Sequence, residues 1–404
     1  MQKTFWLKFS VLNFFIVAVL GVIMRYKILY SLPFLDQKHL QEAHSHFAFY
    51  AWITNALYVL IVIYLGKINV NIDLKKYQRI IIVNILASFA MLGSFIYGGY
   101  FWGSIAASTA ALLCTFVFFY FFLKDAATFN DPSKIWFLAG LFFAVFSSIG
   151  VFSLAYFKTS GNMNRDLFLA AEYYYLHFQY NGFFIFSGIG LLFFSLKEVN
   201  SEISERKNKV IFWFMFFGCL VGYGLSVLWM KLPVYVFAMI VLSAISQTVG
   251  AFFLYAYVKK SWINLVLNWS PMQRFVLLFA GFAFFVKIVL QLGSTIPEVN
   301  QFAFGFRNVV IAYLHLVLLM CIATFLINQI LATNFFTITK PLLLGVKLLL
   351  LGIFLNEFML GLMGVFSIAY IAVPFANHFL LYISLLMMIS ILVIFINLKK
   401  KEIR

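Results

Sequence analysis

The sequence predicts an all-α, polytopic membrane protein of about twelve transmembrane helices. Of its 404 residues, 64% are hydrophobic and only 10% are charged, whereas a soluble domain is about half apolar and a quarter charged. The apolar residues gather in runs of about 20, the length that crosses a bilayer as a helix with its backbone polar groups bonded internally. We therefore expect one transmembrane helical domain over residues 1–404, with the lipid bilayer as its surroundings.

Twelve apolar runs follow one another, and each is expected to form one membrane-spanning helix. The first is long enough to span and has no small-residue cleavage site after it, which favours a helix over a removed signal peptide. The least secure division separates the seventh run from the eighth, at residues 231–233. The expected helices are 5–24, 43–65, 79–98, 101–123, 135–157, 167–196, 210–230, 233–258, 272–292, 306–331, 341–364 and 374–398.

The distribution of Lys and Arg predicts the orientation of the helices. With the N-terminus inside, 20 of the 29 basic residues fall in inside segments and seven in outside segments, while Lys287 and Lys347 lie within helices. Inside loops carry the excess of basic residues, so both termini are expected in the cytoplasm, with the chain in a bacterial plasma membrane. The polar run 198–209 is then a cytoplasmic linker. Because topology accounts for the net charge of +16, nucleic acid is not an expected partner.

The six histidines are the most informative polar residues. Apart from His39 in the first outer loop, each lies in an even-numbered helix and in its outer half. A neutral imidazole in hydrocarbon needs partners for its nitrogens, and histidine is a common axial ligand of haem iron. For each histidine taken singly, the alternative is a hydrogen bond to a neighbouring carbonyl or hydroxyl group. The membrane histidines are His44 and His46 in helix two, His177 in helix six, His315 in helix ten and His378 in helix twelve.

Helices two, six and ten are separated by intervals of four helices, which predicts a threefold arrangement of four-helix arcs. Their local sequences are Ala43-His44-Ser45 in helix two, His177 followed by Gly182 in helix six, and Tyr313-Leu314-His315 in helix ten. With these motifs and twelve helices over nearly its whole length, the chain resembles the haem-copper oxidase superfamily, the catalytic subunit I of cytochrome oxidases and nitric oxide reductases.

The resemblance implies roles for five residues. In that family, helix two carries a low-spin haem ligand, which matches His44, with His46 as the rival assignment. Helix ten carries a His-x-His pair, so His315 resembles the second low-spin ligand and Tyr313 stands where the high-spin haem ligand is found. His177 resembles the helix-six ligand of a second, non-haem metal. The implied cofactor is a b-type haem.

The chain departs from the family in helix seven. That helix should bring a pair of histidines to the non-haem metal, but residues 210–230 contain none. A copper or iron ion held by His177 alone would lack the imidazoles that fix its geometry and affinity. Copper, non-haem iron and a working oxygen-reducing centre are therefore not expected, and whether the chain is an oxidoreductase like the family's enzymes stays open.

Three functions follow from these observations. The first is a respiratory-type membrane haem protein for electron transfer or diatomic gas binding, working with a redox partner or an additional membrane subunit. The second is a transporter or channel whose intramembrane charges line a route, with Glu357 paired to Lys287 or Lys347. The third is a cofactor-free assembly subunit. The charges in question are Glu172, Lys287, Lys347 and Glu357.

Overall fold

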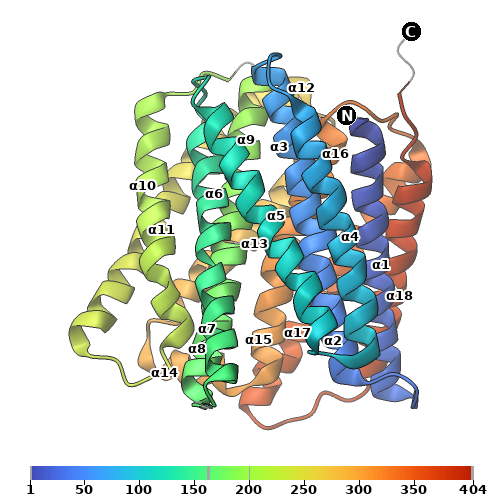
Figure 1. Cartoon of the computed structure of the whole chain (residues 1–404), viewed down its shortest axis with the longest axis vertical. Coiled ribbons are helices and arrows are strands. Elements are labelled where there is room, and N and C mark those ends of the chain that lie inside the picture. Colours follow the sequence, from blue (N-terminus) through green and yellow to red (C-terminus); the bar gives the residue numbers. More distant parts are fainter. Residues whose placement is uncertain (1, 162–163, 200, 402–404) are drawn as a thin grey trace. The chain divides into compact units, whose positions relative to one another are not determined.

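The computed structural model describes residues 2–161, 164–199 and 201–401 (Figure 1). Within these ranges the chain is helical, and the β pairing is limited to one isolated bridge between Phe336 and Lys400. In the described residues, twelve continuous helical stretches are long and apolar enough to cross a membrane. Some of these spans join two or three of the elements named below, as Gln37–Ile68 does. The expected all-α, multi-pass membrane fold is thereby confirmed, and each expected run corresponds to one of these helices. The seventh and eighth runs are separate spans, as expected.

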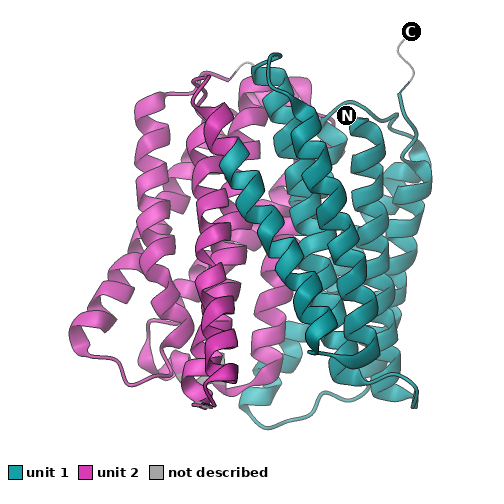
Figure 2. Ribbon diagram, viewed as in Figure 1, with its two compact units in different colours: residues 1–121, 323–404 teal, residues 122–322 magenta. Residues whose placement is uncertain are grey.

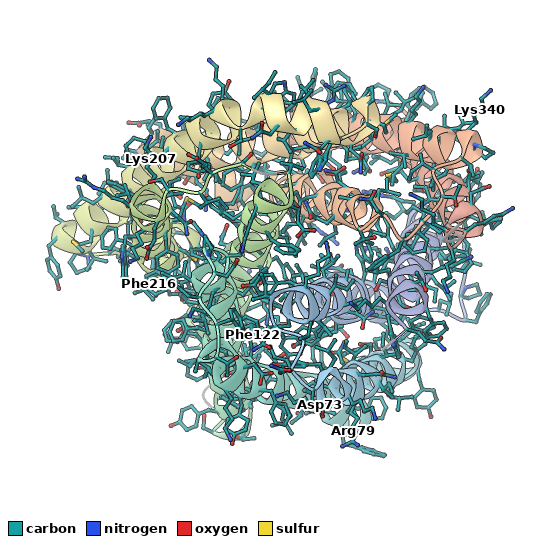
Figure 3. All side chains as sticks on the ribbon, turned by 90° about the horizontal axis from the view of Figure 1, so that it is seen from above. Asp73, Arg79, Phe122, Lys207, Phe216 and Lys340 are labelled. Atoms are coloured by element: carbon teal, nitrogen blue, oxygen red, sulfur yellow. The ribbon has the colours of Figure 1, made fainter. Side chains whose placement is uncertain are left out.

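The chain divides into two compact units, and unit 1 combines Met1–Phe121 with Ala323–Arg404 (Figure 2). Within it, α1 packs against α18, and the start of α1 and the end of α18 lie at the same end (Figure 1). Charged side chains at helix ends, such as Arg79 and Lys340, are exposed at its rim (Figure 3). Its elements are α1 (Lys3–Leu29), α2 (Gln37–Phe47), η1 (Ala48–Thr54), α3 (Asn55–Ile68), α4 (Leu74–Gly98), α5 (Trp102–Ala126, which ends beyond the boundary), α16 (Thr324–Ala332), α17 (Lys340–Ile368) and α18 (Ala376–Asn397).

Unit 2 is the continuous segment Phe122–Ile322. In this unit α10 packs along α11, α7 along α8, and α6 against η2 and α9. The two short helices α12 and α14 connect spans and were not expected from hydropathy. The elements are α6 (Lys134–Phe146), α7 (Ser148–Thr159), α8 (Arg165–His177), η2 (Phe178–Phe184), α9 (Ile185–Glu198), α10 (Glu205–Gly222), η3 (Tyr223–Val227), α11 (Val234–Lys260), α12 (Trp262–Asn268), α13 (Pro271–Gly293), α14 (Pro297–Gly305), α15 (Arg307–His315) and η4 (Leu316–Ala323, whose last residue lies in unit 1).

The second and sixth spans are the most enclosed. In each of them, 94% of the most apolar 18-residue window is buried, against 33–56% in the other ten spans. A helix that faces lipid on one side packs against protein on its other side only. An enclosed helix has protein on all sides, so each of its polar groups must find a hydrogen-bond partner within the protein. The histidines of these two spans therefore lie on helices where protein contacts decide their roles.

A π-helical segment interrupts the second, sixth and tenth spans. The segment η2 begins directly after His177 and η4 directly after His315, while η1 begins four residues after His44. In the described part of the chain, the other spans contain no such segment. Because π-helical turns are rare and frequently mark functional sites, their recurrence at every fourth span supports the equivalence of these three helices.

Buried asparagines support the π-helical segment η1. The side-chain amide of Asn13 donates to the carbonyl of Ala51 at 2.7 Å, and that of Asn84 donates to the carbonyl of Tyr50 at 3.1 Å. A π-helical turn alters the regular backbone hydrogen bonding, and hydrocarbon offers no water as a substitute partner. These two side chains, from α1 and α4, supply donors where water cannot.

Gly150 allows the backbones of α7 and α8 to approach closely. A Cβ atom at this position would lie 2.5 Å from the carbonyl oxygen of Ala171 and 2.8 Å from the backbone nitrogen of Tyr175. Both contacts are with backbone atoms, which can be relieved only by moving a helix.

We therefore expect Gly150→Ala to lower the free energy of unfolding by about 1–3 kcal/mol, the usual cost of overpacking. Thermal unfolding of the purified protein measures this change. Gly281→Ala is the matched control, because nothing lies within 4 Å of a Cβ atom there. Equal stability of the two variants would contradict the packing argument.

Candidate functional site

The first turn of α2 is fixed by Asp36 outside the membrane. Its carboxylate accepts hydrogen bonds from the backbone N–H groups of Lys38 at 2.8 Å and His39 at 2.9 Å. These bonds, chiefly the one from His39, lower the pKa of Asp36. A carboxylate with a lowered pKa stabilises the folded state above its unfolded pKa, and this contribution is lost as the pH falls through the folded value. The cap therefore holds the start of the helix that carries His44 at neutral pH.

His44 faces α1 within unit 1. Its Nδ1 lies 3.1 Å from the carbonyl oxygen of Val17. Since a carbonyl can only accept, Nδ1 carries the proton and the lone pair of the neutral ring is on Nε2. Gly21, one turn further along α1, lies beside the ring, and a Cβ atom there would be in ordinary van der Waals contact with His44 Cε1, at 3.6 Å.

His46 faces away from His44. Its Nε2 lies 2.8 Å from the hydroxyl oxygen of Tyr100, and its ring centroid is 4.4 Å from that of Phe95 in α4. Two residues along an α-helix point in nearly opposite directions, so only one of these histidines can face α1. The Nε2 atom of His46 is already engaged by a tyrosine hydroxyl.

His315 in unit 2 has the same ring arrangement as His44. Its Nδ1 lies 2.9 Å from the carbonyl oxygen of Ile311, one turn earlier in α15. The proton is again on Nδ1 and the lone pair on Nε2. Both histidines are half-buried. A histidine that binds a metal generally donates its other ring N–H to a carbonyl or carboxylate group, which fixes its tautomer and orientation.

His177 is fully buried and has the opposite tautomer. Its Nε2–H donates to the carbonyl of Cys219 at 2.8 Å, and its Nδ1 accepts from the side-chain amide of Asn181 at 3.1 Å. Both ring nitrogens are therefore engaged by protein groups. A metal ion at His177 would have to replace one of these two bonds.

Tyr313 packs against a second tyrosine. Its ring lies edge-on to the ring of Tyr180, with the centroids 6.4 Å apart and the ring planes at 71°. This geometry is typical of aromatic packing. Because Tyr313 is two residues before His315 in the same helix, the two side chains point in different directions.

Lys287 is the least expected side chain inside unit 2. It is only 1% exposed, and its ammonium group donates to Gln291 Oε1 at 2.6 Å. It forms no ion pair with any described residue. Its electrostatic neighbours are the thiols of Cys219 and Cys321 and the ring of His177. An ammonium group buried without a counter-charge is costly and is a functional-site candidate by default.

Two unsatisfied acceptors belong to side chains that lie near His177. Asn181 Oδ1 and Gln247 Oε1 are buried in unit 2 without a hydrogen-bond partner. Gly222 brings Gln247 close to His177, because a Cβ atom there would lie 3.3 Å from Gln247 Nε2 and 3.7 Å from His177 Cε1. Buried acceptors of this kind usually mark a bound water or ligand. We call these residues the Lys287 cluster: His177, Asn181, Cys219, Gln247, Lys287, Gln291 and Cys321.

The other intramembrane charges are arranged differently from the expectation. In unit 1, Glu357 accepts a hydrogen bond from the neighbouring Asn356 at 3.0 Å and forms no ion pair with Lys347. Ten residues of α-helix separate Glu357 from Lys347, a rise of about 15 Å. Lys347 is exposed, as is Glu172 in unit 2. Lys287 is therefore the intramembrane charge whose setting most needs a functional explanation.

Among the residues that the structure describes, no three His, Cys, Asp or Glu side chains group closely enough to hold a metal ion between them. His44 and His46 belong to unit 1, whereas His177, Tyr313 and His315 belong to unit 2. Within unit 2, His177 lies in the Lys287 cluster and Tyr313 packs against Tyr180. No family model and no curated protein sequence matches this chain.

Proposed function

We propose that this chain is a membrane haem protein of the haem-copper oxidase type that would bind a low-spin b-type haem through histidine, with His44 of unit 1 and His315 of unit 2 as its candidate ligands. One observation carries the proposal: both rings donate Nδ1–H to a backbone carbonyl, which places the lone pair on Nε2. A carbonyl partner is also what each histidine would have without a cofactor, and at Nδ1 it is the usual arrangement of a metal-bound histidine. His46 packs against α4 and Tyr100 and does not face α1, and both ring nitrogens of His177 are hydrogen bonded within unit 2, so neither residue is assigned as a ligand.

A haem held by two histidines would supply one-electron transfer, because its iron would have no position open to a substrate. The chain's own groups hold and tune the ligands. The carbonyls of Val17 and Ile311 orient the two rings and increase the basicity of Nε2, and Gly21 lies beside the ring of His44.

The proposed location is a bacterial plasma membrane with both termini in the cytoplasm, in agreement with the excess of Lys and Arg in the inside segments. Both histidines then lie in the outer half of the membrane, where the electron would be exchanged with a redox partner or a further membrane subunit.

The direct test is a reduced-minus-oxidised absorption spectrum of the purified full chain, together with haem extraction. We expect a low-spin b-type spectrum and one haem for each chain. Protein that is fully helical and colourless after expression with excess haem precursor would overturn the proposal, and would leave transport or a cofactor-free assembly role.

A transporter is the second candidate, and the Lys287 cluster favours it. A buried ammonium that interacts with a histidine, itself near two side chains with unsatisfied acceptors, can take up and pass on a proton or hold an anion. The test is the decay of a pH gradient across proteoliposomes that contain the purified chain. Lys287→Met should stop the flux, and Lys347→Met, which changes an exposed lysine, should keep it. A gradient that decays equally with empty liposomes would exclude this function.

A further inference from the structure

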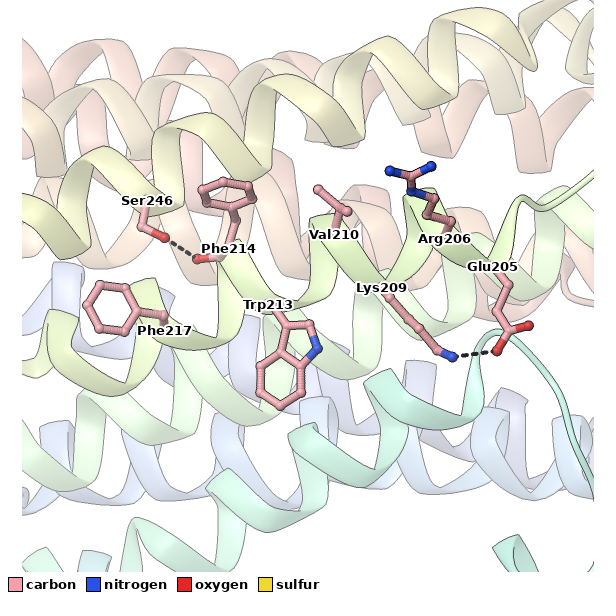
Figure 4. A pocket seen from close by; sticks show the side chains of 8 residues that line it. All are labelled: Glu205, Arg206, Lys209, Val210, Trp213, Phe214, Phe217 and Ser246. Atoms are coloured by element: carbon pink, nitrogen blue, oxygen red, sulfur yellow. Dashed lines mark hydrogen bonds and ion pairs between the residues drawn. The ribbon is translucent and has the colours of Figure 1, made fainter.

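An open groove of about 740 Å³ runs along α10 on the surface of unit 2. Its wall consists of two neighbouring rows of side chains on α10. Within each row, residues three or four positions apart in the sequence lie one above the other. Ser246 from α11 closes it at one end, and its hydroxyl donates to the carbonyl of Phe214 at 2.8 Å. Figure 4 shows the charged residues at one end of the groove, with Phe217 and Ser246 at the other.

The two ends of the groove differ in chemistry. At the charged end, Lys209 is neutralised by Glu205, with Nζ and Oε1 2.7 Å apart. Arg206 forms no ion pair with any described residue, and it is exposed. Toward the other end the wall is apolar, with Trp213 60% exposed and Phe217 37% exposed. The groove therefore offers one uncompensated positive charge followed by an apolar channel.

The length of the groove matches one leaflet of a bilayer. Arg206 and Phe217 are eleven residues apart in α10, a rise of about 16 Å. The hydrocarbon of one leaflet is about 15 Å thick. A lipid with its headgroup at Arg206 would therefore lay its acyl chain along Trp213 to the level of Phe217.

We propose that this groove is a binding site for an anionic phospholipid, with the phosphate-bearing headgroup on Arg206 and an acyl chain along α10. The charge of Arg206 selects an anionic headgroup over a zwitterionic one, because the Glu205–Lys209 pair adds no net charge. Exposed aromatic side chains in hydrocarbon bind any acyl chain, so selectivity resides in the headgroup. This site is independent of the proposed haem and of the Lys287 cluster.

The test is native mass spectrometry of the full chain titrated with phosphatidylglycerol or with phosphatidylcholine of the same acyl chains. A basic residue near an anionic surface contributes about a fivefold gain in affinity. We expect the wild type to bind phosphatidylglycerol about fivefold more tightly than phosphatidylcholine. Arg206→Gln should remove this preference. Lys207→Gln is the matched control, since it makes the same charge change one residue away and does not line the groove.

A second variant tests the apolar part of the site. Val210 is 40% exposed and lines the groove. A tryptophan side chain in its place would fill the groove and would not have to enter the interior of unit 2. We expect this variant to weaken the binding of phosphatidylglycerol and of phosphatidylcholine by a similar factor. Equal affinity of the wild type for the two lipids would overturn the proposal. Equal losses in Arg206→Gln and Lys207→Gln would also overturn it, because the preference would then come from the general positive charge of this surface.

Discussion

His44→Ala and His315→Ala are each expected to abolish the low-spin b-type spectrum of the purified protein. A low-spin haem would need two histidine ligands, so loss of a ligand would give a high-spin haem or no haem at all. The readout is the reduced-minus-oxidised spectrum, with electron paramagnetic resonance of the oxidised form to separate low-spin from high-spin iron. In both variants the low-spin signal should disappear while the helical content is retained.

His46→Ala and His378→Ala are the controls for this experiment. His46 is hydrogen bonded to Tyr100 and His378 is exposed, so both variants should keep the low-spin spectrum. If His46→Ala loses the signal and His44→Ala keeps it, the assignment of the helix-two ligand is wrong. If all four variants keep it, the iron is held by groups outside the proposed pair.

Lys287→Met is expected to raise the free energy of unfolding by about 1–4 kcal/mol, the gain seen when well-packed apolar side chains replace buried charged groups. Methionine fills a similar volume and removes an ammonium group that has one neutral hydrogen-bond partner, Gln291. The measurement is thermal or denaturant unfolding of the purified protein. A gain of stability in this variant would indicate that Lys287 serves a function at a cost to the stability of the fold.

Two further variants make this prediction specific. Lys347→Met makes the same change at an exposed position and should alter stability little. Gln291→Leu removes the partner of the buried ammonium and should lower stability by about 1.5–3 kcal/mol, while the double variant Lys287→Met with Gln291→Leu should recover it. A Lys287→Met variant that is strongly destabilised would show that the lysine is a structural part of unit 2.

The predicted spans depended on local sequence only. A bilayer demands about 20 apolar residues for each crossing and internal hydrogen bonds for the backbone, so the run from residue 79 to 98 indicates a helix whatever its neighbours are. The observed helix α4 begins five residues earlier, at Leu74, because hydropathy does not register the polar first turn after the cap at Asp73. The short helix α14 was missed for a related reason, since nine residues are too few to span.

The sequence by itself determined the fold class, the twelve spans and the membrane histidines, because each of these depends on composition and spacing along the chain. The tertiary structure decided which face of helix two carries each histidine, which ring nitrogen holds the proton, and that Lys287 is buried. Those properties depend on a carbonyl of α1, a tyrosine after α4 and thiols from α10 and η4. Such partners are 27 to 68 residues away in the chain, and only packing brings them together.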